Sequence, residues 1–169
     1  MQVDTEPLPR AFDTWYRVVH PRLLTTLVAM TGDLDVAREA TDEALARAYE
    51  GWARVSVMES AAGWTYRVGC NLVRRSQRRR AVEHRLLRKH LPDSTIAGPA
   101  GELWLMVQQL PARQATAVLL RHVGQLTEQE IAAVMGIKRG TVSVTLRNAY
   151  ARLRVDVGAS DSEMETRHA

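Results

Sequence analysis

Residues 126–154 read LTEQEIAAVMGIKRGTVSVTLRNAYARLR and predict two helices joined by a tight turn. Thr127 and Glu130 have the spacing of a capping box, in which a hydroxyl and a carboxylate satisfy backbone N–H groups at a helix start. Gly136 suits the position just past a helix end, where a left-handed backbone costs glycine nothing. A second helix resumes at Arg139–Thr141, so the stretch has the form of a helix-turn-helix.

The second helix of this pair has an apolar stripe and a polar, basic outer face. Spacings of three and four residues turn one set inward, namely Val142, Leu146, Ala149 and Leu153. The outward set is Arg139, Ser143, Val144, Arg147 and Asn148. Such a helix is typical of those that enter the major groove of DNA. Spacing alone leaves open an ordinary helical hairpin with a solvated face.

Composition bounds the class of protein. The chain has 169 residues, of which 46% are hydrophobic, so it can bury one ordinary core or two small ones. Helical periodicity recurs and strand signals are scarce, which predicts an all-α protein. No apolar run is long enough to span a bilayer, so we expect a cytoplasmic protein without membrane insertion. The lone Cys70 excludes an internal disulfide.

The charges are segregated along the chain, although the net charge is only +4. Acidic residues outnumber basic ones before Arg67. From Arg67 to Lys89 the balance inverts, and Glu83 is the single acidic residue. The basic residues of this segment are Arg67, Arg74, Arg75, Arg78, Arg79, Arg80, Arg85, Arg88 and Lys89. This segment is suited to a polyanion. A solvated helix face or a basic tail is the alternative.

Turn-forming residues divide the chain into two small helical domains. In the first, residues 10–90, one helix is interrupted or bent near Pro21, a second starts at Asp33–Asp35, and a third runs from Ser60 after the loop Ala53–Glu59. Residues 91–101, LPDSTIAGPAG, predict a flexible linker about which the domains reorient freely. The second domain covers residues 102–154, and the polar tail 155–169 is expected to be disordered.

Enzymatic functions find little support in the residues. His84 and His90 are six residues apart, which is the wrong helical spacing for a shared metal, and they lie among arginines. No nucleophile turn or glycine-rich phosphate loop is present in the sequence. We therefore expect no catalytic activity, no metal and no cofactor.

Several motifs, in order and spacing, resemble the extracytoplasmic-function class of bacterial sigma factors, from the sigma-70 family. They span about Phe12 to Arg154 and comprise Gly32-Asp33, the acidic helix with Glu43, Arg47, Ala48 and Tyr49, Trp64-Thr65-Tyr66-Arg67-Val68, Asn71-Leu72, Leu110-Pro111, Leu126-Thr127, Glu130-Ile131-Ala132 and Gly140-Thr141-Val142. The resemblance implies a promoter-specificity subunit that binds core RNA polymerase, recognises minus-thirty-five and minus-ten DNA and initiates transcription. It also brings in an anti-sigma protein as a candidate partner.

The resemblance assigns a role to each part of the chain. Polymerase docking falls to Arg38, Glu39, Asp42, Glu43 and Arg47 on the second helix. Binding of the unpaired minus-ten strand falls to Tyr66, Arg67, Asn71, Arg74 and Arg75, with the loop Ala53–Glu59 as a base pocket. In the minus-thirty-five duplex, Ser143, Val144 and Arg147 face base edges, while Arg139, Thr141, Thr145 and Asn148 lie nearer phosphates.

This chain departs from the family pattern at several of these positions. Asp42 stands where the family commonly has Gln, and Ser143-Val144 stand where a cation followed by Ser is usual. Duplex binding by the second domain alone is therefore expected to be weak. Two other functions stay open: a stand-alone helix-turn-helix regulator and, more distantly, an interaction protein whose basic helix binds an acidic partner.

Overall fold

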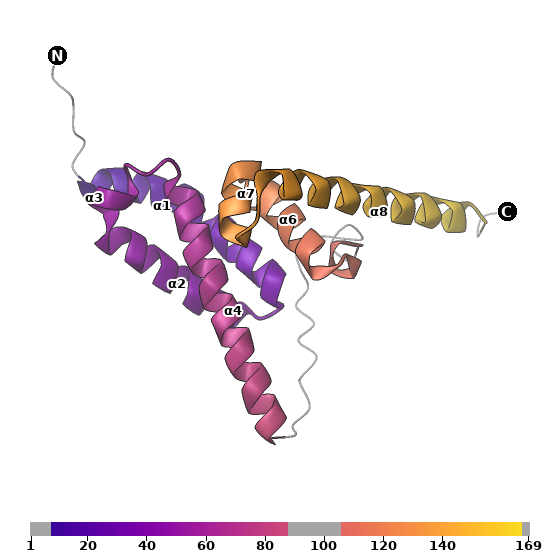
Figure 1. Cartoon of the computed structure of the whole chain (residues 1–169), viewed down its shortest axis with the longest axis horizontal. Coiled ribbons are helices and arrows are strands. Elements are labelled where there is room, and N and C mark those ends of the chain that lie inside the picture. Colours follow the sequence, from indigo (N-terminus) through magenta and orange to yellow (C-terminus); the bar gives the residue numbers. More distant parts are fainter. Residues whose placement is uncertain (1–7, 88–105, 167–169) are drawn as a thin grey trace, which may run out of the picture.

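The computed structural model describes residues 8–87 and 106–166, and over these residues every regular element is a helix (Figure 1). The N-terminal half comprises α1 (Leu8–Thr31), α2 (Leu34–Glu50), α3 (Trp52–Val55) and α4 (Ala61–Leu87). The C-terminal half comprises a helical turn at residues 106–109, α6 (Ala112–His122), α7 (Glu128–Met135) and α8 (Arg139–Thr166). The all-α prediction is confirmed. The expected linker, residues 91–101, lies outside the described residues.

Pro21 does not interrupt the first helix, which runs unbroken from Leu8 to Thr31. Leu23 and Leu27 beyond the proline are fully buried, and Val19 before it is buried as well. Burial of this stripe on both sides of Pro21 stabilises the helix by more than the one backbone hydrogen bond that proline removes. We expected the helix to be interrupted or bent near Pro21, and the interruption is absent.

The start of α2 was predicted correctly. Asp33 is its N-cap, and its carboxylate accepts hydrogen bonds from the backbone N–H groups of Asp35 and Val36 at 3.0 Å each. The helix ends at Gly51, and the short α3 then leads into the loop before α4.

The two halves pack against each other. α1 contacts α6, α4 contacts α7, and one hydrophobic core extends from Leu23 on α1 through Tyr66 on α4 to Leu146 on α8. A Cβ atom at Gly124 would lie 3.0 Å from Cε1 of Tyr66, so only glycine lets the ring approach this closely. Free reorientation of the halves was the wrong expectation for this conformation, because the Tyr66 ring joins their cores.

The C-terminal tail also differs from expectation. We predicted disorder from Val155 onward, but α8 continues to Thr166. A helix that is already nucleated extends at the cost of fixing single residues, without the large cost of forming a first turn. Polar composition alone therefore did not decide the state of this segment.

The helix-turn-helix follows its prediction closely. Thr127 and Glu130 form the complete capping box at the start of α7, and Gly136 ends that helix in the left-handed region with φ 67°. α8 then begins at Arg139, and Val142 and Ala149 on its inner face are fully buried.

We expect Gly136→Ala to lower the free energy of unfolding by about 1 kcal/mol, because a Cβ atom disfavours a left-handed backbone. No atom lies within 4 Å of the place that this Cβ would take, so strain of the backbone is the only cost. Gly140→Ala is the matched control, since it also meets no neighbour within 4 Å but lies in the first turn of α8. It should leave stability unchanged or raise it by up to about 1 kcal/mol. Equal losses in urea unfolding would contradict this assignment.

Candidate nucleic-acid interface

One side of α4 carries a row of exposed basic and amide side chains. Arg67, Asn71, Arg75 and Arg78 recur at three- and four-residue spacing, which places them on one face of the helix, and all four are exposed. Arg74 is half-buried beside them, and its Nη1 donates a hydrogen bond to Oδ1 of Asn71 at 3.3 Å. The amide oxygen of Asn71 is thus engaged by its neighbour on the same helix. These contacts bring four of the five expected strand-binding residues together.

The basic helix is tied to the start of α2 by an ion pair. Nη1 of Arg80 lies 2.5 Å from Oδ2 of Asp33, the carboxylate that also caps α2. The hydrogen bond from the backbone of Val36, together with that from Arg80, holds the pKa of Asp33 below its usual value. Asp33 thus links the direction of α4 to the position of α2.

Tyr66 is the exception among the expected strand-binding residues. It is 1% exposed, and burial raises the pKa of its hydroxyl to about 12. In this conformation the ring is not available to stack on a base, so a role in strand binding requires the halves to separate first. Its side chain joins the core because it turns away from the exposed row on α4 and packs against Gly124. Trp64 is the aromatic residue that remains half-buried on the accessible side of α4.

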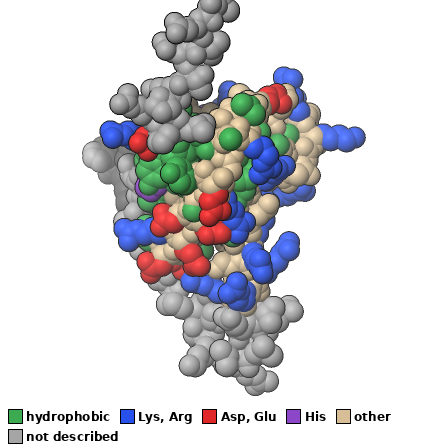
Figure 2. Space-filling model, turned by 90° about the vertical axis from the view of Figure 1, so that its left-hand side faces the viewer, with side chains coloured by type: hydrophobic (Ala, Val, Ile, Leu, Met, Phe, Trp, Pro, Cys, Tyr) green, Lys and Arg blue, Asp and Glu red, His purple; other side chains and the backbone are tan. Residues whose placement is uncertain are grey.

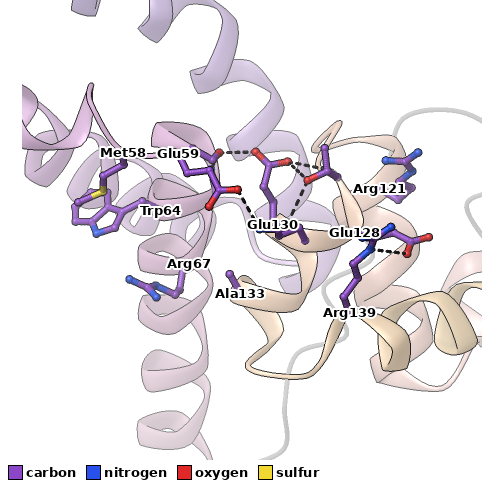
Figure 3. A pocket seen from close by; sticks show the side chains of 13 residues that line it. Met58, Glu59, Trp64, Arg67, Arg121, Glu128, Glu130, Ala133 and Arg139 are labelled. Carbon is purple, nitrogen blue, oxygen red and sulfur yellow. Dashed lines mark hydrogen bonds and ion pairs between the residues drawn. The ribbon is translucent and has the colours of Figure 1, made fainter.

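A groove of about 800 Å³ separates the accessible side of α4 from the helix-turn-helix (Figure 3). The N-terminal half contributes the end of the predicted base-pocket loop, Met58 and Glu59, together with Trp64 and Arg67 of α4. The C-terminal half contributes Arg121, Glu128, Glu130, Ala133 and Arg139. One residue expected to bind each promoter element, Arg67 and Arg139, therefore lines this groove.

Glu130 joins the two walls of this groove. Its Oε2 accepts hydrogen bonds from the backbone N–H and hydroxyl of Thr127 at 2.6 and 2.8 Å, and its Oε1 accepts from the hydroxyl of Ser60. Ser60 in turn accepts a hydrogen bond from the backbone N–H of Gly63 at 2.8 Å, in the first turn of α4. We call this the Ser60–Glu130 contact. It connects the capped start of α7 to the capped start of α4.

A neighbouring hydrogen bond and a shifted pKa accompany the Ser60–Glu130 contact. Nε2 of Gln129 donates to Oε1 of Glu59 at 3.0 Å. Partial burial by itself would raise the pKa of Glu130, but the hydrogen bonds from Ser60 and Thr127 outweigh it and hold the pKa below its ordinary value. The carboxylate is thus stabilised in its charged form where the halves meet.

The recognition helix α8 presents the outer face that its spacing predicted. Val144 is 44% exposed, and the other exposed members of the expected set are Arg139, Thr141, Ser143, Arg147 and Asn148. Thr145 is half-buried, and its hydroxyl donates to the carbonyl oxygen of Thr141 at 2.7 Å. Ser143 and Arg139 both contact Glu128 of α7.

The expected docking residues share the outer side of α2. Arg38, Glu39, Asp42, Glu43 and Arg47 are all exposed, and Nη2 of Arg47 pairs with Oε1 of Glu43 at 2.7 Å. Acidic side chains gather beside basic ones on the face seen in Figure 2. A groove of about 670 Å³ runs between α2 and α4, with Glu39, Asp42 and Glu43 on one wall and Arg75 and Arg79 on the other.

Four residues at these contacts were not predicted as functional from the sequence, namely Ser60, Glu128, Gln129 and Glu130. Ser60 and Glu59 meet partners 70 positions later, Glu130 and Gln129 respectively, and no local spacing signals such a pair. Glu128 meets Ser143 across the turn, 15 positions away. The predicted helix-turn-helix is the only feature of the sequence that could have indicated the contact between Glu128 and Ser143, because it fixes how α7 crosses α8.

Comparison with known proteins identifies the family. The RNA polymerase sigma-E factor of Streptomyces coelicolor is 30% identical over 156 residues, which cover 89% of this chain and 88% of that protein. The sigma-E factor of Streptomyces antibioticus is 32% identical over 89% of this chain and 86% of its own length. This chain is an extracytoplasmic-function sigma factor of the sigma-70 family. It is therefore a promoter-specificity subunit that binds core RNA polymerase and initiates transcription.

Further comparisons agree with the fold of a sigma factor. The family model for sigma-70 region 4 matches residues 100–153, which include the helix-turn-helix. The sigma factor RpoE of Bartonella quintana, solved in complex with the anti-sigma factor NepR, superposes with a TM-score of 0.71 at 18% identity, over 86% of this chain and 95% of that one. CnrH, solved with the cytosolic domain of CnrY, gives a TM-score of 0.61 at 18% identity, over 89% and 90%. Sigma factors are regulatory subunits. None of the helices in residues 8–87 and 106–166 of this one is long and apolar enough to cross a membrane.

Two substitutions at Ser60 test whether the Ser60–Glu130 contact holds the halves of this sigma factor together. Ser60→Asp keeps an acceptor for the N–H of Gly63 but sets a carboxylate against that of Glu130, so the halves should separate. Ser60→Asn also caps α4 and can still donate to Glu130, so it is the matched control. We expect a larger radius of gyration in small-angle scattering for Ser60→Asp only. The same radius for both variants and the unsubstituted chain would show that this contact is not what joins the halves.

Proposed function

We propose that three surfaces divide the work of promoter recognition in this sigma factor. The accessible side of α4 binds the unpaired minus-ten strand, the outer face of α8 reads the minus-thirty-five duplex, and the outer side of α2 docks on core polymerase. The observation that carries the proposal is the single row of exposed side chains on α4 that begins at the groove, Arg67, Asn71 and Arg75.

Single-strand binding needs groups that stack on bases and groups that follow phosphates. Trp64 offers a half-buried ring at the groove, and the guanidinium carbon of Arg54 lies 6.0 Å from the centre of that ring. Arg67 lies on the same wall. Asn71 has its amide oxygen engaged by Arg74, so its NH₂ group is the one left to donate to an acceptor on a base edge.

Duplex reading by α8 follows from the exposure of its polar face. Arg147 is exposed in the middle of that face, where a guanidinium can donate two hydrogen bonds to guanine in the major groove. Arg139 and Asn148 lie nearer phosphates. Of the residues assigned to the duplex, only Arg139 and Arg147 are positively charged. Affinity for the duplex therefore depends on core polymerase holding both DNA-binding surfaces in place.

Polymerase docking is assigned to α2 because its outer side is charged, exposed and unlike the DNA-facing surfaces. Glu39, Asp42 and Glu43 suit a basic partner, and Arg47 adds a mixed-charge edge that orients it. An anti-sigma protein is a second candidate partner, since the sigma factor RpoE of Bartonella quintana was solved with one. The chain acts in the cytoplasm, beside polymerase, and performs no catalytic step of its own.

Promoter binding requires the halves to separate. The minus-ten and minus-thirty-five elements are about 25 base pairs apart, which is about 85 Å of duplex at 3.4 Å per base pair. In the described conformation Glu59 and Gln129 are in hydrogen-bond contact, so α4 and α7 are far too close to occupy both elements. We take this conformation as the closed state of the free chain, which core polymerase opens.

Asn71→Ala and Arg147→Ala distinguish the two DNA-binding surfaces. With core polymerase, Asn71→Ala should reduce strand opening, measured as permanganate reactivity of unpaired thymines, while binding to the upstream duplex persists. Arg147→Ala should weaken upstream binding by about 1–3 kcal/mol and relax preference at one base pair.

The result that contradicts this division is an equal effect of both substitutions on opening and on duplex binding. A stand-alone regulator, the alternative function, predicts a different pattern. It would bind its site without polymerase, respond to Arg147→Ala there, and open no DNA at all.

A further inference from the structure

Glu128, in the first turn of α7, contacts two residues of the recognition helix α8. Its Oε2 accepts a hydrogen bond from the hydroxyl of Ser143 and lies 4.0 Å from Nε of Arg139. Figure 3 shows Glu128 and Arg139 pointing toward one another at the edge of the groove. A carboxylate therefore lies among residues that face DNA, where it adds no attraction for phosphate.

This contact fixes where the hydroxyl proton of Ser143 goes. A serine hydroxyl has one proton to donate and two lone pairs to accept with. The acceptors in reach of that proton are Oε2 of Glu128 and, at 3.4 Å, the backbone carbonyl oxygen of Arg139. Both belong to the protein, and neither can give a proton back. The exposed side of the hydroxyl therefore offers only lone pairs to a ligand.

The major groove distinguishes bases by which of them donate. Cytosine presents its N4 amine and adenine its N6 amine, whereas guanine presents two acceptors and thymine an acceptor beside a methyl group. A surface that can only accept hydrogen bonds pairs with the amine of cytosine or adenine. It leaves the acceptors of guanine and thymine without partners, which is unfavourable once water is excluded.

We propose that Glu128 sets base preference by holding Ser143 as an acceptor, so that the pair selects cytosine or adenine at one position of the upstream duplex. The inference rests on the proposed role of α8 in reading that duplex. Glu128 is a positioning residue, because it acts through the Ser143 hydroxyl.

The alternative role for Glu128 is simple neutralisation of Arg139. That ion pair is long at 4.0 Å, and the side chain of Arg139 is 73% exposed, so solvent screens most of it. Neutralisation would also alter affinity for every DNA sequence alike, since phosphates carry no sequence information. A change in preference at one base pair is therefore the signature of the hydrogen bond.

The test uses the full chain with core polymerase and a promoter library randomised across the upstream element. The unsubstituted chain should favour cytosine or adenine over guanine at one position by about fivefold or more. Glu128→Ala removes the acceptor of the serine proton, and Ser143→Ala removes the hydroxyl, so each should reduce this preference to below about twofold while other positions keep theirs. Ser143→Thr keeps the hydroxyl and should keep the preference. Glu50→Gln, at the end of α2, controls for loss of one negative charge.

Three outcomes overturn the inference while leaving the proposed function intact. They are a preference for guanine or thymine at the position that Ser143→Ala affects, an even change across all sequences with Glu128→Ala, and no change of preference with Glu128→Ala. If the unsubstituted chain shows no upstream preference at all, the proposed role of α8 is wrong and the inference falls with it. Thermal unfolding of each variant separates these results from loss of folding.

Discussion

The carboxylate of Glu130 is the group on which the arrangement of this sigma factor depends. One oxygen completes the capping box of α7 with Thr127, and the other accepts from Ser60 at the start of α4. The pKa of Glu130 is held below its ordinary value of 4.5, so the stabilisation is fully present above pH 4.5 and is lost as the pH falls below it. Protonation of Glu130 thus weakens both the cap of α7 and the contact between the halves.

The same interaction is weak enough to be reversible. A hydrogen bond to a charged group contributes about 1.5–3 kcal/mol, and the bond between Gln129 and Glu59 adds less, since one neutral partner donates it at the surface. The apolar contact of the Tyr66 ring with Gly124 adds to the stabilisation of the closed arrangement. Docking on core polymerase buries further surface of the sigma factor. If polymerase binds the open state more tightly than the closed state by a few kcal/mol, that difference is sufficient to favour the open state. A closed free chain and an open bound one are therefore compatible.

Local patterns in the sequence predicted what local interactions determine. The capping box at Thr127, the left-handed Gly136, the N-cap Asp33 and the outer face of α8 each depend on residues a few positions apart, and all are present in the structure. The burial of Tyr66 was not predicted, because its motif neighbours Arg67 and Asn71 face outward, whereas the ring turns toward the other half of the chain. No spacing rule reveals that Ser60 meets Glu130, since the contact exists only once both domains are placed. The continuation of α8 to Thr166 was missed because composition does not report an adjoining helix.

The most direct test of this account is promoter-dependent transcription by core polymerase with the closed state locked. Glu59→Cys and Gln129→Cys place two thiols at a contact between the halves, and a short bis-maleimide joins them, while the native Cys70 is buried and protected. The account predicts that the crosslinked chain supports no transcription, whereas the same chain before crosslinking and each single-cysteine chain after labelling remain active. Full activity of the crosslinked chain would show that the halves need not separate, and it would contradict the closed and open states described above.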